Sequence, residues 1–232
     1  MSDVGMLVIR PKLCVACKRC MIECALAHSE AEELEEAMAA NPAPQPRVRV
    51  RPLGDYSAPY ACRHCEDPPC VPACPNDALA KLGEGDRVAL DLDACTGEAK
   101  CVKRCPFLGI YLHPSGEHAV KCDLCIERLE RGEMPACATA CPTGAITYRG
   151  PEELEDEDKA FLAAKGGGLI RKEGVTYSID PDKCIACRRC ARVCPAEAVK
   201  GEKKTPHEII LERCIQCGAC YLACPADAVQ AT

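Results

Sequence analysis

The cysteines of this chain occur in a repeated pattern whose spacing is typical of iron–sulfur ligation. The most regular copy runs from Cys184 to Pro195 with the spacing C-x2-C-x2-C-x3-C-P, and a second copy runs from Cys214 to Pro225. Thiolates at this spacing bind a [4Fe–4S] cluster, and in two-cluster ferredoxins the fourth cysteine of each run ligates the other cluster. The trailing proline turns the chain away because its φ is fixed and it has no N–H to donate.

Four further runs in the chain are altered copies of the same pattern, which makes six motifs in all. Motifs I to VI comprise, in order, Cys14, Cys17, Cys20 and Cys24; Cys62, Cys65, Cys70 and Cys74; Cys95, Cys101 and Cys105; Cys122, Cys125, Cys137 and Cys141; Cys184, Cys187, Cys190 and Cys194; and Cys214, Cys217, Cys220 and Cys224. Six complete runs need one cysteine more than the 23 in the chain, and the vacancy is Glu98 in motif III. No cysteine is left over, so the census favours a ligand role for every one.

Two other uses of cysteine fit the sequence poorly. An odd number of cysteines cannot all pair as disulfides, and the first twelve residues lack the apolar stretch of an export signal. Structural zinc favours C-x2-C pairs set well apart rather than repeated four-cysteine runs. Rieske ligation needs two histidines for one cluster, so His64, which lies between Cys62 and Cys65, is interpreted as a partly exposed loop residue.

Composition limits the remaining possibilities. The chain has 232 residues, no Trp and only 3% aromatic residues, so a core of large side chains is thin and bound clusters are expected to hold the fold together. A net charge of −6 gives no general reason to bind nucleic acid. No apolar run is long enough to span a membrane, and we expect a cytoplasmic protein.

Short elements are expected between the motifs. Alternating or apolar segments predict strands at 6–9, 47–51, 88–92, 145–148 and 175–179. The Glu- and Ala-rich segment 29–40 predicts a solvated surface helix capped by Ser29, followed by a proline-rich extended linker at 41–46. The acidic, glycine-containing segment 150–173 predicts a flexible linker with one helix. It separates a module at 1–149 from a domain at 174–232.

The distances between motifs predict how they pair. Cys74 and Cys95 are separated by nearly the same length of chain as Cys194 and Cys214, with a turn and a strand between them in each case. Motifs II and III therefore form one unit as V and VI do, and motifs I and IV pair around it, with strands 6–9 and 145–148 side by side. Exchange of fourth cysteines then predicts six ligand sets. Set 1 is Cys14, Cys17, Cys20 and Cys141; set 2 is Cys62, Cys65, Cys70 and Cys105; set 3 is Cys74, Cys95 and Cys101, with Glu98 as a candidate iron ligand; set 4 is Cys24, Cys122, Cys125 and Cys137; set 5 is Cys184, Cys187, Cys190 and Cys224; set 6 is Cys194, Cys214, Cys217 and Cys220.

These motifs resemble a known family. The runs that carry the resemblance are Cys62-Arg-His-Cys65 with Asp67-Pro-Pro-Cys70, Cys101-Val-Lys-Arg-Cys-Pro-Phe107, Lys121-Cys-Asp-Leu-Cys125, and Cys137-Ala-Thr-Ala-Cys-Pro-Thr-Gly-Ala145. Residues 1–149 resemble the four-cluster iron–sulfur subunits of molybdenum and tungsten bis-pterin oxidoreductases, a fold also used with hydrogenases and carbon monoxide dehydrogenase. Residues 174–232 are similar to a bacterial two-cluster ferredoxin. Glu98 and the appended ferredoxin depart from the family pattern.

The resemblance implies an α+β, loop-rich fold of repeated 2[4Fe–4S] ferredoxin-like units, two nested and one C-terminal. It also implies an electron-transfer subunit that is not catalytic alone. The sequence agrees, since it has no Ser-His-Asp set, phosphate loop or dinucleotide fingerprint. A Mo/W-pterin subunit that oxidises a substrate such as formate or an aldehyde is the expected partner. A carbon monoxide dehydrogenase or hydrogenase subunit is the alternative, and a freestanding polyferredoxin shuttle or a structural metal-binding module are further ones. A flavoprotein or ferredoxin is expected as the second redox partner, with the C-terminal domain at one end of the chain of clusters.

The character of the third centre is left open by the sequence. Glu98 stands where motif III needs a thiolate, and a carboxylate is a harder ligand that iron also accepts. Five [4Fe–4S] clusters are therefore expected together with a sixth centre at set 3. That centre is either a four-iron cluster with Glu98 or water on one iron, or a three-iron cluster.

Overall fold

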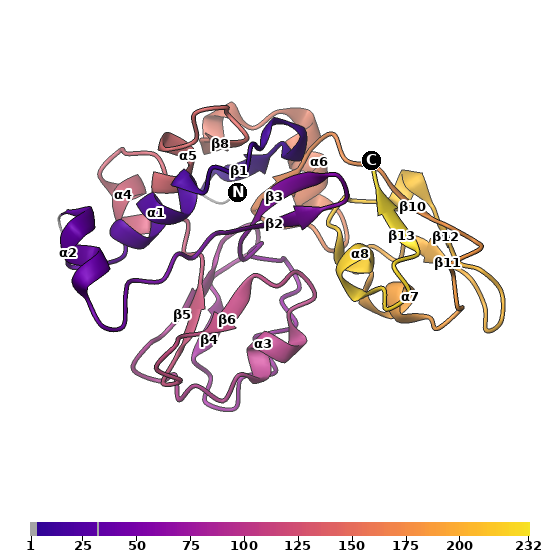
Figure 1. Cartoon of the computed structure of the whole chain (residues 1–232), viewed down its shortest axis with the longest axis horizontal. Helices are drawn as coiled ribbons and strands as arrows, with labels where there is room; N and C mark the ends of the chain where they lie inside the picture. The colour runs from indigo at the N-terminus through magenta and orange to yellow at the C-terminus, as the bar shows by residue number, and fades with distance from the viewer. Residues whose placement is uncertain (1–3, 32) are drawn as a thin grey trace.

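The computed structural model describes residues 4–31 and 33–232. Small antiparallel pairs of strands and short helices are joined by long loops, and the largest sheet has three strands. Figure 1 shows the module at 1–149 as an upper and a lower lobe, with the C-terminal residues forming a third lobe beside them. The structure thus has the mixed, loop-rich architecture of repeated ferredoxin-like units that the motifs predict.

The upper lobe contains motifs I and IV. Its elements are β1 (Met6–Ile9), η1 (Pro11–Leu13), α1 (Arg19–Leu26), α2 (Leu34–Ala39), α4 (Ile126–Glu130), α5 (Ala136–Thr139) and β8 (Ile146–Arg149). Strand β1 is antiparallel to β8, with Met6 opposite Arg149 and Ile9 opposite Ile146. The prediction that the first strand pairs with the strand after motif IV is therefore confirmed, with β8 one residue further along the chain than expected.

The lower lobe contains motifs II and III. Its elements are β4 (Leu79–Lys81), β5 (Val88–Leu90), α3 (Lys100–Arg104), β6 (Ile110–Leu112) and β7 (Ala119–Lys121). Strand β4 pairs with β5, and β6 with β7. The hairpin of β2 (Arg49–Leu53) and β3 (Tyr56–Tyr60) precedes this lobe, and β2 begins two residues later than the strand predicted at 47–51.

The C-terminal lobe repeats the nested strand pattern. Its elements are β10 (Tyr177–Ile179), α7 (Arg189–Val193), β11 (Val199–Lys200), β12 (Glu208–Ile209), η3 (Leu211–Arg213), α8 (Ala219–Ala223) and β13 (Val229–Ala231). Its first strand pairs with its last, and β11 pairs with β12 between them. Leu53 and Tyr60 of the β2–β3 hairpin pack into the core of this lobe, so the hairpin joins it to the module.

The helix predicted at 29–40 is shorter than expected. Helix α2 begins at Leu34, and residue 32 lies outside the described residues. The prediction that Ser29 caps this helix is wrong. Its hydroxyl donates to the carbonyl oxygen of Leu26 at 2.9 Å, because Ser29 follows the end of α1 rather than starting α2.

The segment predicted as a flexible linker packs against the module. It contains η2 (Pro151–Glu153), α6 (Asp156–Ala163) and β9 (Ile170–Lys172), and β9 lies parallel to β1 with Ile170 opposite Leu7. The packing of this segment could not be predicted from its acidic composition, because it has few apolar side chains. The largest of these, such as Phe161 and Leu169, are buried. Whether 174–232 folds independently remains a prediction.

Candidate iron–sulfur centres

The structure gathers the cysteine thiols into groups that share members across distant motifs. Burial raises the pKa of the Cys20 thiol to about 12, and Cys141 is the first of the thiols that raise it further. Burial likewise raises the pKa of Cys137 well above its usual range, with Cys122 and Cys24 adding to the effect. Residues far apart in sequence, in sets 1 and 4, are thus neighbours in space.

The other predicted sets show the same kind of proximity. Burial and the thiols of Cys62, Cys105 and Cys65 raise the pKa of Cys70 to about 12. Burial and the thiols of Cys74 and Cys95 raise the pKa of Cys101. Burial and the thiols of Cys217, Cys214 and Cys194 raise the pKa of Cys220 to about 12. For set 5, one cavity is lined by Cys184, Cys187, Cys190 and Cys224. Ligation of iron by these sets, and the identity of the third centre, remain predictions.

The local backbone explains why three cysteines of one motif converge. In motif V, Ala186 and Arg188 on either side of Cys187 have φ of 54° and 64°, and the corresponding residues of motifs I and VI have the same sign. This left-handed conformation costs roughly 1–2 kcal/mol for a residue with a Cβ, so it persists only where the surroundings impose it. It curls the loop around the site. The cysteine at the third position of motifs I, III, IV, V and VI, which is Cys101 in motif III, is then the second residue of a short helix.

The fourth cysteines receive hydrogen bonds from the backbone. The Ala198 N–H donates to Cys194 Sγ at 3.2 Å, the Ala228 N–H to Cys224 Sγ at 3.3 Å, and the Gly109 N–H to Cys105 Sγ at 3.4 Å. Each donor lies four residues after its cysteine. Such bonds stabilise negative charge on sulfur and are one means by which a protein sets a cluster's potential.

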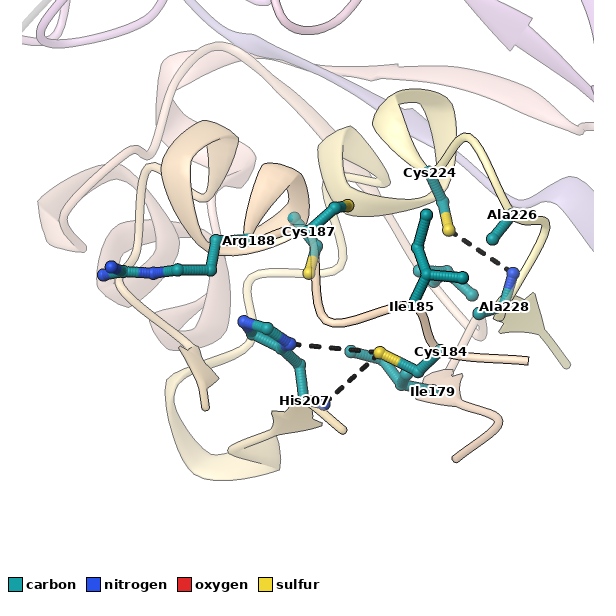
Figure 2. A pocket seen from close by; sticks show the side chains of 11 residues that line it. Ile179, Cys184, Ile185, Cys187, Arg188, His207, Cys224, Ala226 and Ala228 are labelled. Carbon is teal, nitrogen blue, oxygen red and sulfur yellow. Dashed lines mark hydrogen bonds between the residues drawn. The ribbon is translucent and has the colours of Figure 1, made fainter. Parts of the chain in front are cut away.

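Figure 2 shows the surroundings of set 5. The Cys184 sulfur accepts a hydrogen bond from the His207 N–H at 3.5 Å and lies 3.9 Å from His207 Nδ1. Cys187 is exposed and Ile185 is 65% exposed, so one edge of this set faces solvent. Apolar side chains such as Ile179 and Val229 line the rest of the cavity. The set thus combines a largely apolar lining with one open edge.

Buried cations fit the presence of an anionic group at the thiol sets. In the described ranges, Lys172 Nζ and Arg63 Nη1 are buried and have no hydrogen-bond partner among protein groups. Cys217 lies near Lys172, and Arg63 follows Cys62 directly. Burial and Arg63 lower the pKa of Lys172 to about 7, and a negatively charged thiolate-bound cluster nearby would favour the charged form of the amine and offset the cost of burying both groups. The same clusters, when bound, accept and donate single electrons.

The surroundings of two histidines beside the ligand sets, His64 and His28, were not predicted from the sequence. His64 is fully buried and its Nδ1 accepts a hydrogen bond from the Val88 N–H at 3.0 Å, so the expectation of a partly exposed loop residue is wrong. His28 lies 3.8 Å from both Cys24 Sγ and Cys125 Sγ, with Nε2 3.0 Å from Asp123. Burial opposes the protonation of His28, but Asp123 and the two cysteines raise its pKa to about 12. Nothing in the sequence links residues so far apart.

Glu98 is turned toward solvent in this structure. Its carboxylate lies 2.8 Å from Lys100 Nζ, and its side chain is 43% exposed. Cys95 receives a hydrogen bond from the Ala119 N–H at 3.4 Å, so set 3 keeps the backbone support found elsewhere. A role for Glu98 as an iron ligand remains a prediction, and it requires this ion pair to open. Among the described residues, no helix is long and apolar enough to cross a membrane.

Comparisons with known proteins agree with this architecture. Family profiles described as a 4Fe–4S dicluster domain match residues 55–150, 120–198 and 176–225. Protein NrfC of Escherichia coli is 31% identical over 157 residues, which cover 66% of this chain and 68% of that protein. One of the chains of polysulfide reductase from Wolinella succinogenes is 32% identical, over 66% of this chain and 80% of that protein. An iron–sulfur protein of Rhodospirillum rubrum is 37% identical over 59% of this chain and 77% of that protein.

The fold and the thiol sets define an iron–sulfur protein built from repeated ferredoxin-like units. The chain belongs to the family of iron–sulfur electron-transfer subunits of oxidoreductases that includes these relatives. A solved complex containing formate dehydrogenase and heterodisulfide reductase, from Methanospirillum hungatei, shares 18% identity with a TM-score of 0.22 over 74% of this chain and 52% of that one. That score is below the level at which two folds are regarded as alike.

Proposed function

We propose that this chain carries single electrons across six iron–sulfur centres, between a catalytic oxidoreductase subunit and a second redox partner. The observation that supports this most directly is that thiols from distant motifs lie together as the predicted sets require. In addition, each of the 23 cysteines belongs to one of the six sets. Catalysis then belongs to the partner, since each complete set is closed by four thiols. The chain itself has the role of holding, spacing and insulating the centres.

The protein's own groups suit this role. Apolar cores surround the cysteines, as in the cluster of Leu79, Val88 and Ile110 that packs around Cys70 and Cys101. Exclusion of water and a rigid thiol cage reduce the rearrangement that accompanies a change of charge. Backbone N–H donors to sulfur and nearby cations stabilise the added negative charge.

Exposed edges support contact with two partners. Cys17 and Cys187 are the exposed cysteines of the chain, and they belong to sets 1 and 5 in different lobes. Beside them lie Val15 and Ile185, which are 66% and 65% exposed. An apolar rim around an uncovered ligand is suited to a partner whose own redox group must come close.

For the catalytic partner, we favour a Mo/W bis-pterin subunit, with a flavoprotein or ferredoxin as the second partner. Two relatives are named as components of a polysulfide reductase and of a tetrathionate reductase, and these names support a reductase-type partner. A hydrogenase is the alternative favoured by a specific observation. The hydrogenase-2 operon protein HybA is 42% identical over 129 residues, although these cover only 39% of that protein. Carbon monoxide dehydrogenase as a partner and a freestanding shuttle are supported only by the sequence resemblance.

Two measurements test the proposal. Anaerobic analysis of iron and acid-labile sulfide in the intact chain should give about six clusters, and about four or fewer would refute the assignment. Purification from the native source should bring a large stoichiometric subunit with a pterin-bound metal. A chain that purifies alone, yet is reduced by soluble donors, would instead support the shuttle.

A further inference from the structure

A group of unpaired polar atoms lies between ligand sets 2 and 6. Six buried side-chain polar atoms in the described part of the chain lack a partner, and four of them belong to Tyr60, Arg63, Lys172 and Tyr177. Lys172 Nζ is 3.7 Å from the centre of the Tyr60 ring, and both Lys172 Nζ and the Tyr177 hydroxyl lie against Gly218. Arg63, Tyr60, Lys172 and Cys217 line one small cavity. These groups therefore form one site.

Arg63 is held on the side of set 2. It stands between Cys62 and Cys65, its side chain is buried, and its Nε donates to the Ile170 carbonyl oxygen at 3.2 Å. Its guanidinium lies over the rings of Phe107 and Phe161, at 4.6 and 5.3 Å from their centres. Nothing among the described protein groups pairs with its Nη1.

Lys172 is held on the side of set 6. Burial and the nearby Arg63 lower the pKa of Lys172 to about 7, whereas Cys217, a member of set 6, raises it, so negative charge at set 6 favours the protonated amine. Two like charges buried near each other repel, so this arrangement is unfavourable unless negative charge lies close to both. Sets 2 and 6 are the sources of such charge on either side of the pair.

A glycine-containing loop keeps the two sets close. A Cβ on Gly168 would lie 2.5 Å from the Arg63 carbonyl oxygen and 3.2 Å from the Cys65 Cα. A Cβ on Gly166, whose φ is +79°, would lie 2.4 Å from the Cβ of Pro195, the residue after Cys194 of set 6. The loop thus contacts set 2 on one side and set 6 on the other, and its glycines serve close approach rather than flexibility.

Set 2 occupies the middle of the module. Cys62 shares a buried core with Cys20, Cys24, Cys122 and Cys137, which belong to sets 1 and 4. On its other side, motifs II and III link set 2 to set 3. A domain that meets set 2 therefore joins the module between its ends.

We propose that Lys172 and Arg63 form a cationic junction between ligand sets 2 and 6, through which the C-terminal domain joins the middle of the module as a branch. This rests on the proposed function, because the junction needs clusters in both sets. The two cations stabilise added negative charge on either side, and so raise the reduction potentials there. The six centres then form a branched path rather than a single line, with set 3 and the C-terminal domain on separate arms from set 2.

The test is a redox titration of the full-length, iron-loaded chain followed by electron paramagnetic resonance. Three variants are compared with the unaltered chain: Lys172→Met, which removes the charge and keeps much of the stem; Lys172→Gln, a polar neutral replacement; and Lys172→Arg, which keeps the charge. Lys203→Met, at an exposed lysine of the C-terminal lobe, is the matched control. Iron and sulfide contents are measured on every sample.

We expect one or two midpoint potentials to fall in the Met and Gln variants, with the others unchanged and the iron content intact. The Arg variant should restore them, and Lys203→Met should change none. Unchanged midpoints, a uniform shift of all of them, failure of the Arg variant to restore them, or loss of all iron from both neutral variants would overturn the junction. An unaltered chain without iron and sulfide would instead refute the proposed function, so the two failures are distinct.

Discussion

Asp158 joins two elements of the segment 150–173, α6 and β9, to β8 of the module, and its removal should loosen that segment. Its side chain is completely buried in α6. It accepts hydrogen bonds from Arg149 of β8 at 2.6 Å, from Arg171 of β9 at 2.9 Å, and from the N–H of Glu155 at 3.2 Å. One carboxylate therefore holds the helix against both outer strands of the three-stranded sheet.

The magnitude follows from what Asp158→Ala leaves behind. Breaking a buried ion pair by removing one partner costs roughly 3–5 kcal/mol, because the remaining charge is unpaired. Here both arginine side chains are 17% exposed and keep contacts with Glu173 and, respectively, Glu155 and Glu157. We therefore expect a cost around or somewhat below the lower end of that range, about 2–4 kcal/mol. For a chain of this size, this lowers the thermal midpoint by roughly 5–15 °C.

The assay is anaerobic thermal unfolding, with hydrogen exchange at β9 as the local readout. Glu152→Ala, at an exposed acidic residue shortly before α6, is the control for loss of a charge. Exchange at β9 should accelerate in Asp158→Ala while the iron content stays the same. Equal thermal midpoints and equal exchange in the two variants would refute the reasoning.

The pH dependence provides an independent check of the same ion pairs. Burial alone would raise the pKa of Asp158, but the hydrogen bonds from Arg149, Glu155 and Arg171 hold it below its usual value. A carboxyl group whose pKa is lower in the folded state stabilises the protein above its unfolded pKa, about 3.9, and loses this contribution as the pH falls through the folded value. The difference in stability between the unaltered chain and Asp158→Asn should therefore be full at neutral pH and shrink in acid. A difference that grows in acid would contradict the assignment.

Three further predictions concern the centres and the domain contact. Glu98→Cys should give set 3 a fourth thiolate and shift the spin signal and potential of one centre; a spectrum identical to that of the unaltered chain would show that motif III is wrongly assigned. Leu53→Ala should cost about 2–5 kcal/mol, because the fully buried Leu53 packs into the C-terminal core, and should speed proteolysis between the lobes; Leu82→Ala, at a half-exposed leucine, is the control. The fragment 174–232 should hold two clusters when supplied with iron and unfold on chelation, as seen by circular dichroism, whereas a fragment that stays folded without metal would contradict metal-dependent folding.

The motifs allowed much of the local structure to be predicted. The turns around Cys187 and the helix that begins at Arg189 were not predicted, but they agree with the ligand spacing, because three thiols can converge only if the chain curls tightly between them. Strand 6–9 and its partner after motif IV could be predicted, since the nested order of motifs leaves little choice. These features depend on residues close in sequence or on the order of the repeats.

The segment 150–173 shows where such reasoning failed. Its acidic residues and glycines are typical of a linker, yet Asp158 is buried between arginines and Gly166 touches Pro195. A charge pattern does not reveal that its counter-charges come from other elements. Nor does a glycine reveal whether it serves flexibility or close contact, because only the neighbouring chain decides this.

The sequence by itself thus determined the type of centre, the number of motifs and the family, because the type and spacing of the ligand residues decide which metal centre a motif can bind. Only the tertiary structure showed which parts of the lobes contact one another. Arg63, Lys172 and His28 acquire their surroundings through contacts between segments that lie far apart in the chain. The place where the C-terminal domain joins the module depends on side-chain packing across three elements, and spacing along one chain does not encode it.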